Sequence, residues 1–323
     1  MEQENYTSRV NEFVLLGLSQ HPEHQRFLFV IFLFIYLATW LGNLTIIITV
    51  ICDYHLHTPM YFLLANLALM EVSESSITAP KLLQTLLSQH KSISYNGCII
   101  QMFCIHFIGG TVIFFLVAMA ADRYLAIHKP LQYMTIMNWN MCLKVMVIAW
   151  TVAFLHAITV ILMVIQLPFC GPNILDNFYC DIPQVVQLAC TDTYIVELFI
   201  ISNSGLIITG VFTGLLISYT IILLKIRNHL LEGKQKAVST CAAQITVVSL
   251  HLISCAFVYD RPLQKFPEVK FVSVIYTVIS PVLNPIIYTL RNTEMKNAIR
   301  RLAGKVFFSH RGSKMQHMLS VWV

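Results

Sequence analysis

Residues 143–167 read LKVMVIAWTVAFLHAITVILMVIQL, a run of 25 residues in which Lys144 carries the only charge. An α-helix rises about 1.5 Å per residue, so a run of this length spans the hydrocarbon core of a bilayer, which is about 30 Å thick. Backbone polar groups in lipid must be hydrogen-bonded within the protein, which a helix achieves along its own length. The run therefore predicts a transmembrane helix.

Runs of the same kind lie on both sides of this one. They occupy residues 27–51, 60–87, 99–121, 195–224, 237–259 and 271–290. The composition agrees, because 57% of the residues are hydrophobic and only 11% are charged, and the mean hydropathy is +0.69. Soluble domains carry about 25% charged residues. We therefore predict an all-α integral membrane protein, a seven-transmembrane helix bundle with its termini on opposite sides of the membrane.

This reading divides the chain into three parts. Residues 1–26 form an extracellular N-terminal segment, residues 27–290 form the seven-span domain, and residues 291–323 form a cytoplasmic tail with a short amphipathic helix. The first segment is polar and lacks the apolar core of a secretory signal peptide. We expect the first helix to act as an uncleaved anchor.

The distribution of positive charge predicts the orientation. With the N-terminus outside, fourteen of the 21 Lys and Arg residues fall on the inner side, as the positive-inside rule requires. The net charge of +5 is then a feature of the inner membrane surface rather than a sign of nucleic-acid binding. We expect a multi-pass plasma-membrane protein that contacts lipid, with Asn5 of the Asn5-Tyr6-Thr7 sequon as a glycosylation site.

Four of the nine cysteines fall on the proposed outer side. They are Cys98, Cys170, Cys180 and Cys190. Four cysteines in an oxidising compartment predict two disulfides, and the residues alone leave all three connectivities open.

Polar residues inside the expected spans are candidate functional groups, because such residues are costly in lipid. The first span carries Asn43, the second carries Glu71, and the seventh carries Asn284, Pro285 and Tyr288. Two interpretations stay open, namely hydrogen bonding between helices and a site for a proton or sodium ion. We find no spacing of His and Cys typical of a bound metal and expect no cofactor.

The third span has a face that could meet a ligand. His106, Gly109 and Gly110 are spaced i, i+3, i+4 and share one side of the helix. The two glycines leave space or admit a neighbouring helix, and the histidine adds a polar group. The same span ends in Asp122-Arg123-Tyr124.

Several motifs together resemble those of rhodopsin-like G-protein-coupled receptors, and specifically the tetrapod-type olfactory receptors. Residues 56–64 read LHTPMYFLL, and residues 119–131 read MAADRYLAIHKPL, which is similar to the family's MAYDRYVAICKPL. Residues 236–241 read KAVSTC beside the family's KAFSTC, and residues 281–292 read PVLNPIIYTLRN beside PMLNPLIYTLRN. The resemblance covers nearly the whole chain in order.

The resemblance implies a receptor that binds a small volatile, mainly apolar odorant in the outer half of the bundle. It implies a stimulatory, olfactory-type heterotrimeric G protein as the partner, a rise in cAMP as the output, and no enzymatic activity. It also implies disulfides Cys98–Cys180 and Cys170–Cys190. The expected ligand-binding residues are His106, Gly109, Gly110, Asn203, Ile207, Cys255, Tyr259 and Thr277. The expected coupling and switch residues are Asp122, Arg123, Tyr124, Asn284, Pro285 and Tyr288.

The chain departs from the family pattern at five positions. They are Val112, Ala121, Gln244, Leu252 and Asp260. These departures leave a second hypothesis open, a receptor of the same fold that signals weakly or acts as a decoy. A membrane transporter is a third hypothesis, which the missing internal repeat disfavours.

Overall fold

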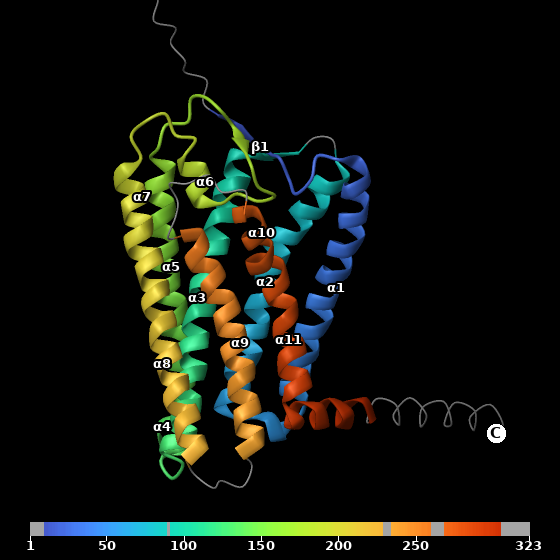
Figure 1. Cartoon of the computed structure of the whole chain (residues 1–323), viewed down its shortest axis with the longest axis vertical. Coiled ribbons are helices and arrows are strands. Elements are labelled where there is room, and N and C mark those ends of the chain that lie inside the picture. The colour runs from blue at the N-terminus through green and yellow to red at the C-terminus, as the bar shows by residue number, and fades with distance from the viewer. Residues whose placement is uncertain (1–9, 89–90, 229–233, 260–267, 305–323) are drawn as a thin grey trace, which may run out of the picture.

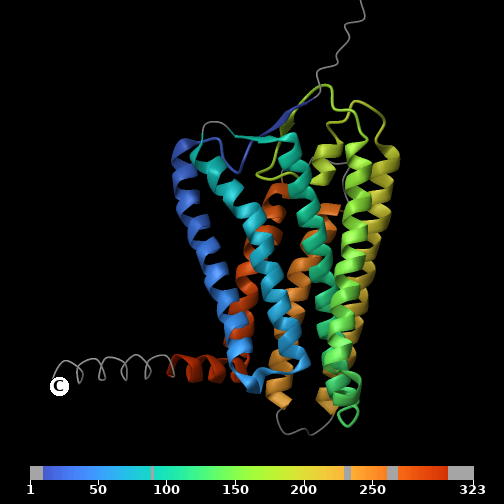
Figure 2. The same ribbon diagram turned by 180° about the vertical axis from the view of Figure 1, so that it is seen from behind.

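The structure is a computed structural model that describes residues 10–88, 91–228, 234–259 and 268–304. Long helices stand side by side in a bundle, and loops with a small sheet cover one end of it (Figures 1 and 2). The bundle consists of α1 (Pro22–Cys52), α2 (Pro59–Leu87), α3 (Tyr95–His128), α5 (Trp139–Ile165), α7 (Tyr194–Ile200) continued through η2 (Ile201–Gly205) into α8 (Leu206–Asn228), α9 (Lys234–Tyr259), and α10 (Glu268–Val274) continued through η3 (Ile275–Ile279) into α11 (Ser280–Arg291).

Shorter elements join these helices. They are the 3₁₀ turn η1 (Tyr54–Leu56), α4 (Tyr133–Ile136), α6 (Ile182–Val186), and the strands β1 (Glu12–Leu15), β2 (Ser92–Ser94) and β3 (Ile174–Leu175). Residues 293–304 form a further helix that runs across the end of the bundle (Figure 1). We call this end the Arg123 end, and the end that carries the sheet the capped end.

Five helices among the described residues are long and apolar enough to cross a membrane. They are Pro22–Cys52, Tyr95–His128, Trp139–Ile165, Tyr194–Lys225 and Val269–Ile287. Two helices fall short of that standard. In α2 the residues Glu71, Glu74 and Lys81 lower the hydropathy, and in the described part of α9 the apolar helix Ile245–Val258 is shorter than 18 residues. The described residues therefore contain five candidate spans, and a membrane-spanning role for α2 and α9 stays a prediction.

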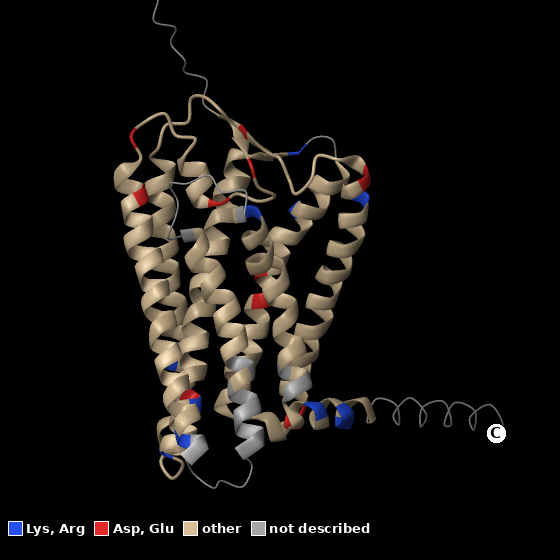
Figure 3. Cartoon of the chain, viewed as in Figure 1, with Lys and Arg blue, Asp and Glu red and all other residues tan. Residues whose placement is uncertain are grey.

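The outer surface of the bundle is apolar along most of its length. In α1, Phe27, Phe34 and Leu41 lie seven residues apart, which is about two helical turns, and each is more than two-thirds exposed. Soluble proteins rarely expose such a continuous apolar stripe, so this face meets lipid. Figure 3 shows the charged residues gathered mainly toward the two ends of the bundle.

The third long helix, α3, lies at the centre. In its most apolar window 61% of the residues are buried, against 17% in α1. Local sequence explains where the helices begin. Proline opens α1 and α2, where its missing N–H costs nothing, while Ser94 and Asn138 cap α3 and α5 by accepting hydrogen bonds from Gly97 and Met141.

The capped end is closed by a three-stranded sheet of order β2-β1-β3. The middle strand pairs antiparallel with β2, where Phe13 faces Ile93, and parallel with β3, where Val14 faces Ile174. Phe13 and Leu15 are fully buried beneath it. The sheet thus ties the N-terminal segment to the loops that follow α2 and α5.

Candidate functional site

A cavity of about 400 Å³ opens between the helices on the side of α3 that His106 occupies. Its size is at the lower end of the range for small-molecule sites. Residues of five bundle helices line it: Ile105, His106, Gly109, Gly110, Ile113, Phe114, Val152, Ala153, Leu155, His156, Thr159, Asn203, Ser204, Ile207, Ile208, Cys255 and Tyr276. None of these lining residues is Asp, Glu, Lys or Arg, so the cavity suits an uncharged ligand.

Two π-helical segments present polar residues to the cavity. One is η2, which contains Asn203 and Ser204, and the other is η3, which contains Tyr276. A π-turn inserts an extra residue and changes the direction in which neighbouring side chains point, and such turns are frequent at functional sites. Two consecutive residues of η2, Asn203 and Ser204, line the cavity.

The polar wall of the cavity is centred on two histidines. The rings of His106 in α3 and His156 in α5 lie nearly parallel, with centroids 6.3 Å apart and an interplanar angle of 13°. His156 Nε2 lies 3.5 Å from the hydroxyl of Ser204. Thr159 also lines the cavity, but its hydroxyl already donates to the Leu155 carbonyl at 2.7 Å. His156 and Ser204 were not among the residues that we expected from the sequence.

The two glycines of α3 are close to neighbouring helices. A Cβ at Gly109 would lie 2.7 Å from the Tyr276 hydroxyl, and one at Gly110 would lie 3.3 Å from the Ala153 Cβ. Gly110 therefore lines the cavity and, because it has no side chain, also lets α5 pack closely against α3. Gly109 makes room for Tyr276, whose side chain also interacts with Glu74 and packs edge-on against the His251 ring, 5.2 Å away.

The structure brings six of the expected ligand residues to this cavity: His106, Gly109, Gly110, Asn203, Ile207 and Cys255. Thr277 is fully buried elsewhere, and its hydroxyl donates to the Ser273 carbonyl. Its neighbour Tyr276 takes the place at the cavity instead. The side chain of Tyr259 lies outside the described residues.

A polar cluster lies in the bundle between α1, α2 and α11. The Asn284 amide donates to the Glu71 carboxyl, and the Asn43 amide donates to the carbonyls of Thr39 and Pro281, each at 3.0 Å. A second acid, Glu74, lies fully buried one turn from Glu71. Sequence reasoning missed Glu74, although it is an acid in the same apolar run and carried the same signal.

Pro285 lies beside this cluster, where a Cβ at Gly42 would be 3.0 Å from its ring. Its missing N–H interrupts the hydrogen bonds of α11. The Tyr288 side chain lies outside the described residues. No group of three or more His, Cys, Asp or Glu side chains suited to a metal ion is found in the described part of the chain.

The motif at the end of α3 forms a hydrogen-bonded group at the Arg123 end. Arg123 donates to Asp122 at 2.9 Å, and the Tyr133 hydroxyl of α4 donates to the other oxygen of the same carboxyl at 2.6 Å. Asp122 is fully buried, whereas the side chain of Arg123 is 22% exposed. The Tyr124 ring stacks on His128, with centroids 4.2 Å apart. Asp122 thus holds Arg123 in place.

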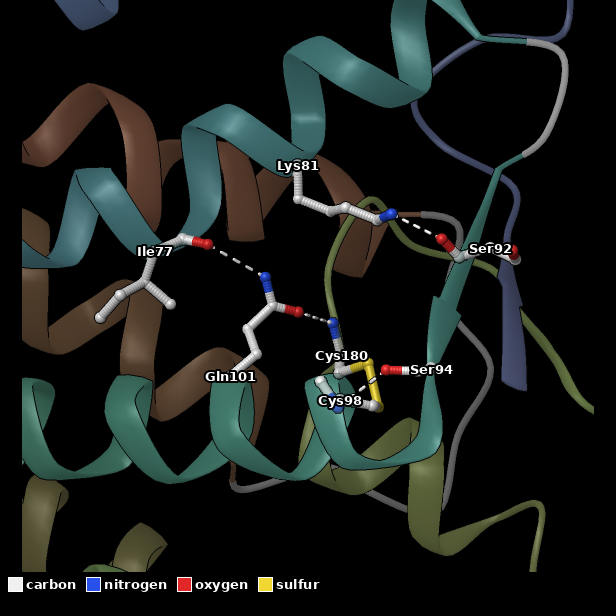
Figure 4. Close-up of a disulfide and its surroundings, with 8 residues drawn as sticks. Ile77, Lys81, Ser92, Ser94, Cys98, Gln101 and Cys180 are labelled. Carbon is white, nitrogen blue, oxygen red and sulfur yellow. Dashed lines mark hydrogen bonds between the residues drawn. A yellow bond between two sulfur atoms is a disulfide. The ribbon is translucent and has the colours of Figure 1, made fainter. Parts of the chain in front are cut away.

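Two disulfides hold the capped end. The structure pairs Cys98 with Cys180 and Cys170 with Cys190. Beside the first bond, Gln101 of α3 joins two segments (Figure 4), because its amide donates to the Ile77 carbonyl at 3.1 Å and accepts from the Cys180 N–H at 2.9 Å. These contacts link the segment after α5 to both α2 and α3 above the cavity.

Next to Cys180, Asp181 is only 2% exposed, and its Oδ2 has no hydrogen-bond partner among the described residues. Burial raises the pKa of Asp181 to about 7, although the Ile182 N–H opposes the shift. This acid was not among the expected site residues.

The five departures from the family pattern have different surroundings. Val112 and Leu252 are buried in the bundle core, whereas Ala121 is exposed. Asp260 and the side chain of Gln244 lie outside the described residues, as does Asn5.

Comparison with known proteins identifies the family. The sequence profile of the family described as "Olfactory receptor" matches residues 32–305. The chain is 50% identical to human olfactory receptor 4E1 over 301 residues, which are 93% of this chain and 96% of that protein. It is 52% identical to human olfactory receptor 4F4 over 293 residues, or 91% and 96% of the two chains, and 53% identical to human olfactory receptor 4D1 over 302 residues, or 94% and 97%. A match across this much of the fold, together with the apolar helices, shows that the chain is a multi-pass membrane protein belonging to the olfactory receptor family of G-protein-coupled receptors.

Proposed function

We propose that this chain is an odorant receptor that binds a small neutral ligand in the cavity beside α3 and activates a stimulatory, olfactory-type G protein to raise cAMP. The observation that supports this most directly is the cavity of about 400 Å³, whose described lining holds no Asp, Glu, Lys or Arg and includes His106 and Tyr276. A cavity of this kind suits a mainly apolar molecule with one or two hydrogen-bonding oxygens, and its lining among the described residues offers no counter-ion for an amine.

The Arg123 end is the proposed contact surface for the G protein. The guanidinium stays charged at physiological pH and presents five donors, so a partner's backbone carbonyls can compete with Asp122 for it. A ligand promotes this exchange only if it binds the coupling-competent state better than the resting state. In this proposal the capped end is extracellular and the Arg123 end cytoplasmic.

The tail supports the same orientation. In the helix at 293–304, Met295 and Ala298 are fully buried while Lys296 and Arg300 are exposed. An amphipathic helix with exposed cations suits the surface of the negatively charged inner leaflet. We propose seven spans, with α2 and α9 crossing the membrane inside the ring of more apolar helices, and a glycan on Asn5.

A cell-based cAMP assay against a broad odorant panel, with surface labelling of the receptor, tests the function. We expect at least one volatile agonist for the wild type. Arg123→Ala should abolish the response while surface level stays near that of the wild type. Lys129→Ala, which removes an exposed cation at the same end, should leave most of the response intact. A full response from Arg123→Ala would contradict the coupling role, and ligand binding without cAMP in the wild type would favour a decoy receptor.

A further inference from the structure

The hydrogen-bonding groups in the polar wall of the cavity determine which oxygen-containing ligands fit it. We propose that His156 of α5 and Ser204 of η2 form a hydrogen-bonding anchor that selects ligands carrying a hydroxyl group, namely neutral alcohols and phenols, over ketones and hydrocarbons of the same carbon skeleton. This inference rests on the proposed odorant-binding function and names the ligand class of the same cavity.

The geometry of the pair is the first argument. The separation of 3.5 Å between His156 Nε2 and Ser204 Oγ is at the outer limit for a hydrogen bond, so the contact is weak. Ser204 is 7% exposed and both residues face the cavity. Buried polar groups with weak contacts gain from a ligand that completes their hydrogen bonds.

The chemistry of the pair is the second argument. A neutral imidazole nitrogen is either a donor or an acceptor, and the serine hydroxyl can act as both. A ligand hydroxyl that enters between them accepts from one group and donates to the other, whichever tautomer His156 adopts. A ketone can only accept, so it leaves the imidazole nitrogen unsatisfied in one of the two tautomers. A hydrocarbon satisfies neither group.

The surroundings of the pair provide the third argument. The lining contains no acidic or basic residue beyond the histidines, which disfavours carboxylate and ammonium ligands. The His106 ring lies nearly parallel to the His156 ring and adds a second aromatic surface beside the anchor. Ile105 and Ile113 also line the cavity and supply apolar surface for the carbon skeleton.

Matched variants separate the anchor from the rest of the cavity. His156→Phe keeps an aromatic ring against His106 and removes both nitrogens, and Ser204→Ala removes only the hydroxyl. Thr159→Val is the control, because Thr159 lines the same cavity but its hydroxyl already donates to the Leu155 carbonyl. All variants are compared at equal surface expression.

The probes are straight-chain and cyclic alcohols, each paired with the ketone and the alkane of the same skeleton. Binding is read from ligand-dependent thermal stabilisation of the purified full-length receptor, and signalling from cAMP. A net hydrogen bond corresponds to about 3- to 10-fold in affinity, so each anchor variant should weaken alcohols by that factor relative to alkanes. Thr159→Val should leave the ratio unchanged. Because both residues contact one hydroxyl, the double variant should lose less than the product of the two single losses.

Two results would overturn the proposal. One is an alcohol-to-ketone affinity ratio that stays the same in His156→Phe and Ser204→Ala, and the other is a wild-type receptor that binds none of the alcohols. Selective alcohol binding that yields no cAMP would support the anchor and contradict only the signalling part of the proposed function.

Discussion

Tyr276 is the residue that joins the cavity to the buried acids of α2. Its hydroxyl would be 2.7 Å from a Cβ at Gly109, and its side chain interacts with Glu74. We expect Gly109→Ala to lower stability by about 1–3 kcal/mol, because overpacking a core displaces buried side chains. Gly110→Ala should cost less, since its Cβ would meet the Ala153 Cβ at 3.3 Å.

Thermal unfolding of detergent-solubilised receptor measures this difference. The double variant Gly109→Ala, Tyr276→Phe removes the clashing hydroxyl. Its loss of unfolding free energy should be smaller than the sum of the losses in the two single variants. Additive losses would show that the steric conflict lies elsewhere.

Asp181 should make stability depend on pH. Its pKa in the folded chain is about 7 against an ordinary value of 3.8, because the carboxyl is buried. Between about pH 4 and pH 7 the folded chain therefore binds more protons than the unfolded chain, so stability falls as pH rises, by at most about 1.4 kcal/mol per pH unit. Above pH 7 the carboxyl is ionised in both the folded and the unfolded chain, so the loss of stability caused by burying its charge no longer changes with pH.

Asp181→Asn should remove that cost. The variant should have a higher Tm than the wild type at pH 8, and the gap should narrow as pH falls and close only below about pH 4. Asp176→Asn is the control, since Asp176 is an exposed acid of the same segment that pairs with Lys270. Parallel Tm curves for wild type and Asp181→Asn would contradict the assignment of a buried, proton-binding carboxyl.

At the scale of elements, an ion pair docks the helix at 293–304 onto the turn after α1. Arg301 donates from Nε and Nη2 to one Asp53 oxygen at 2.9 and 2.6 Å, and His55 contacts the other oxygen at 2.8 Å. Burial of Asp53 opposes ionisation, but the hydrogen bonds from Arg301 and His55 outweigh it and lower its pKa to about 2. The pairing should thus persist at physiological pH and be lost only as pH falls toward 2.

We expect Asp53→Asn to loosen this helix and to cost about 1 kcal/mol, a small value because Arg301 is 44% exposed and partly screened by solvent. Hydrogen exchange of the amides at 294–303 should accelerate in the variant. Lys296→Ala, an exposed substitution on the same helix, should leave the exchange unchanged. Equal exchange in all three proteins would mean that other contacts hold the helix, such as the buried Met295 and Ala298 and the hydrogen bond from the Tyr61 hydroxyl to Glu294.

The sequence predicted where the long helices lie, but not the π-helical segments inside two of them. The apolar runs, the prolines at the starts of α1 and α2, and the caps at Ser94 and Asn138 are local features, so they can be read without a fold. The π-helical segments η2 and η3 could not be read in this way. An inserted residue in a helix leaves the apolar pattern almost unchanged, so the sequence does not reveal the two segments from which Ser204 and Tyr276 line the cavity.

At the scale of the whole molecule, composition and the order of motifs are enough to assign the chain to a membrane-embedded receptor family. The prediction of the olfactory receptor family is confirmed by the profile match and by relatives about 50% identical over most of the chain. Apolar length and motif order are properties of the linear chain, because lipid thickness and hydrogen bonding constrain each span separately.

The cavity wall is a different kind of property: six of the eight expected ligand residues line it, but only the tertiary structure placed His156, Ser204 and Tyr276 beside them. Which face of a helix meets a neighbour depends on the rotation and packing of several helices together, and in lipid both faces can be apolar. In the sequence, His156 is one polar residue in an apolar run. Its place at the cavity follows from the packing of α5 against α3, where Gly110 meets Ala153. Glu74, Asp181 and Arg301 likewise acquire their partners or their burial from segments distant in the chain, and no local pattern encodes those contacts.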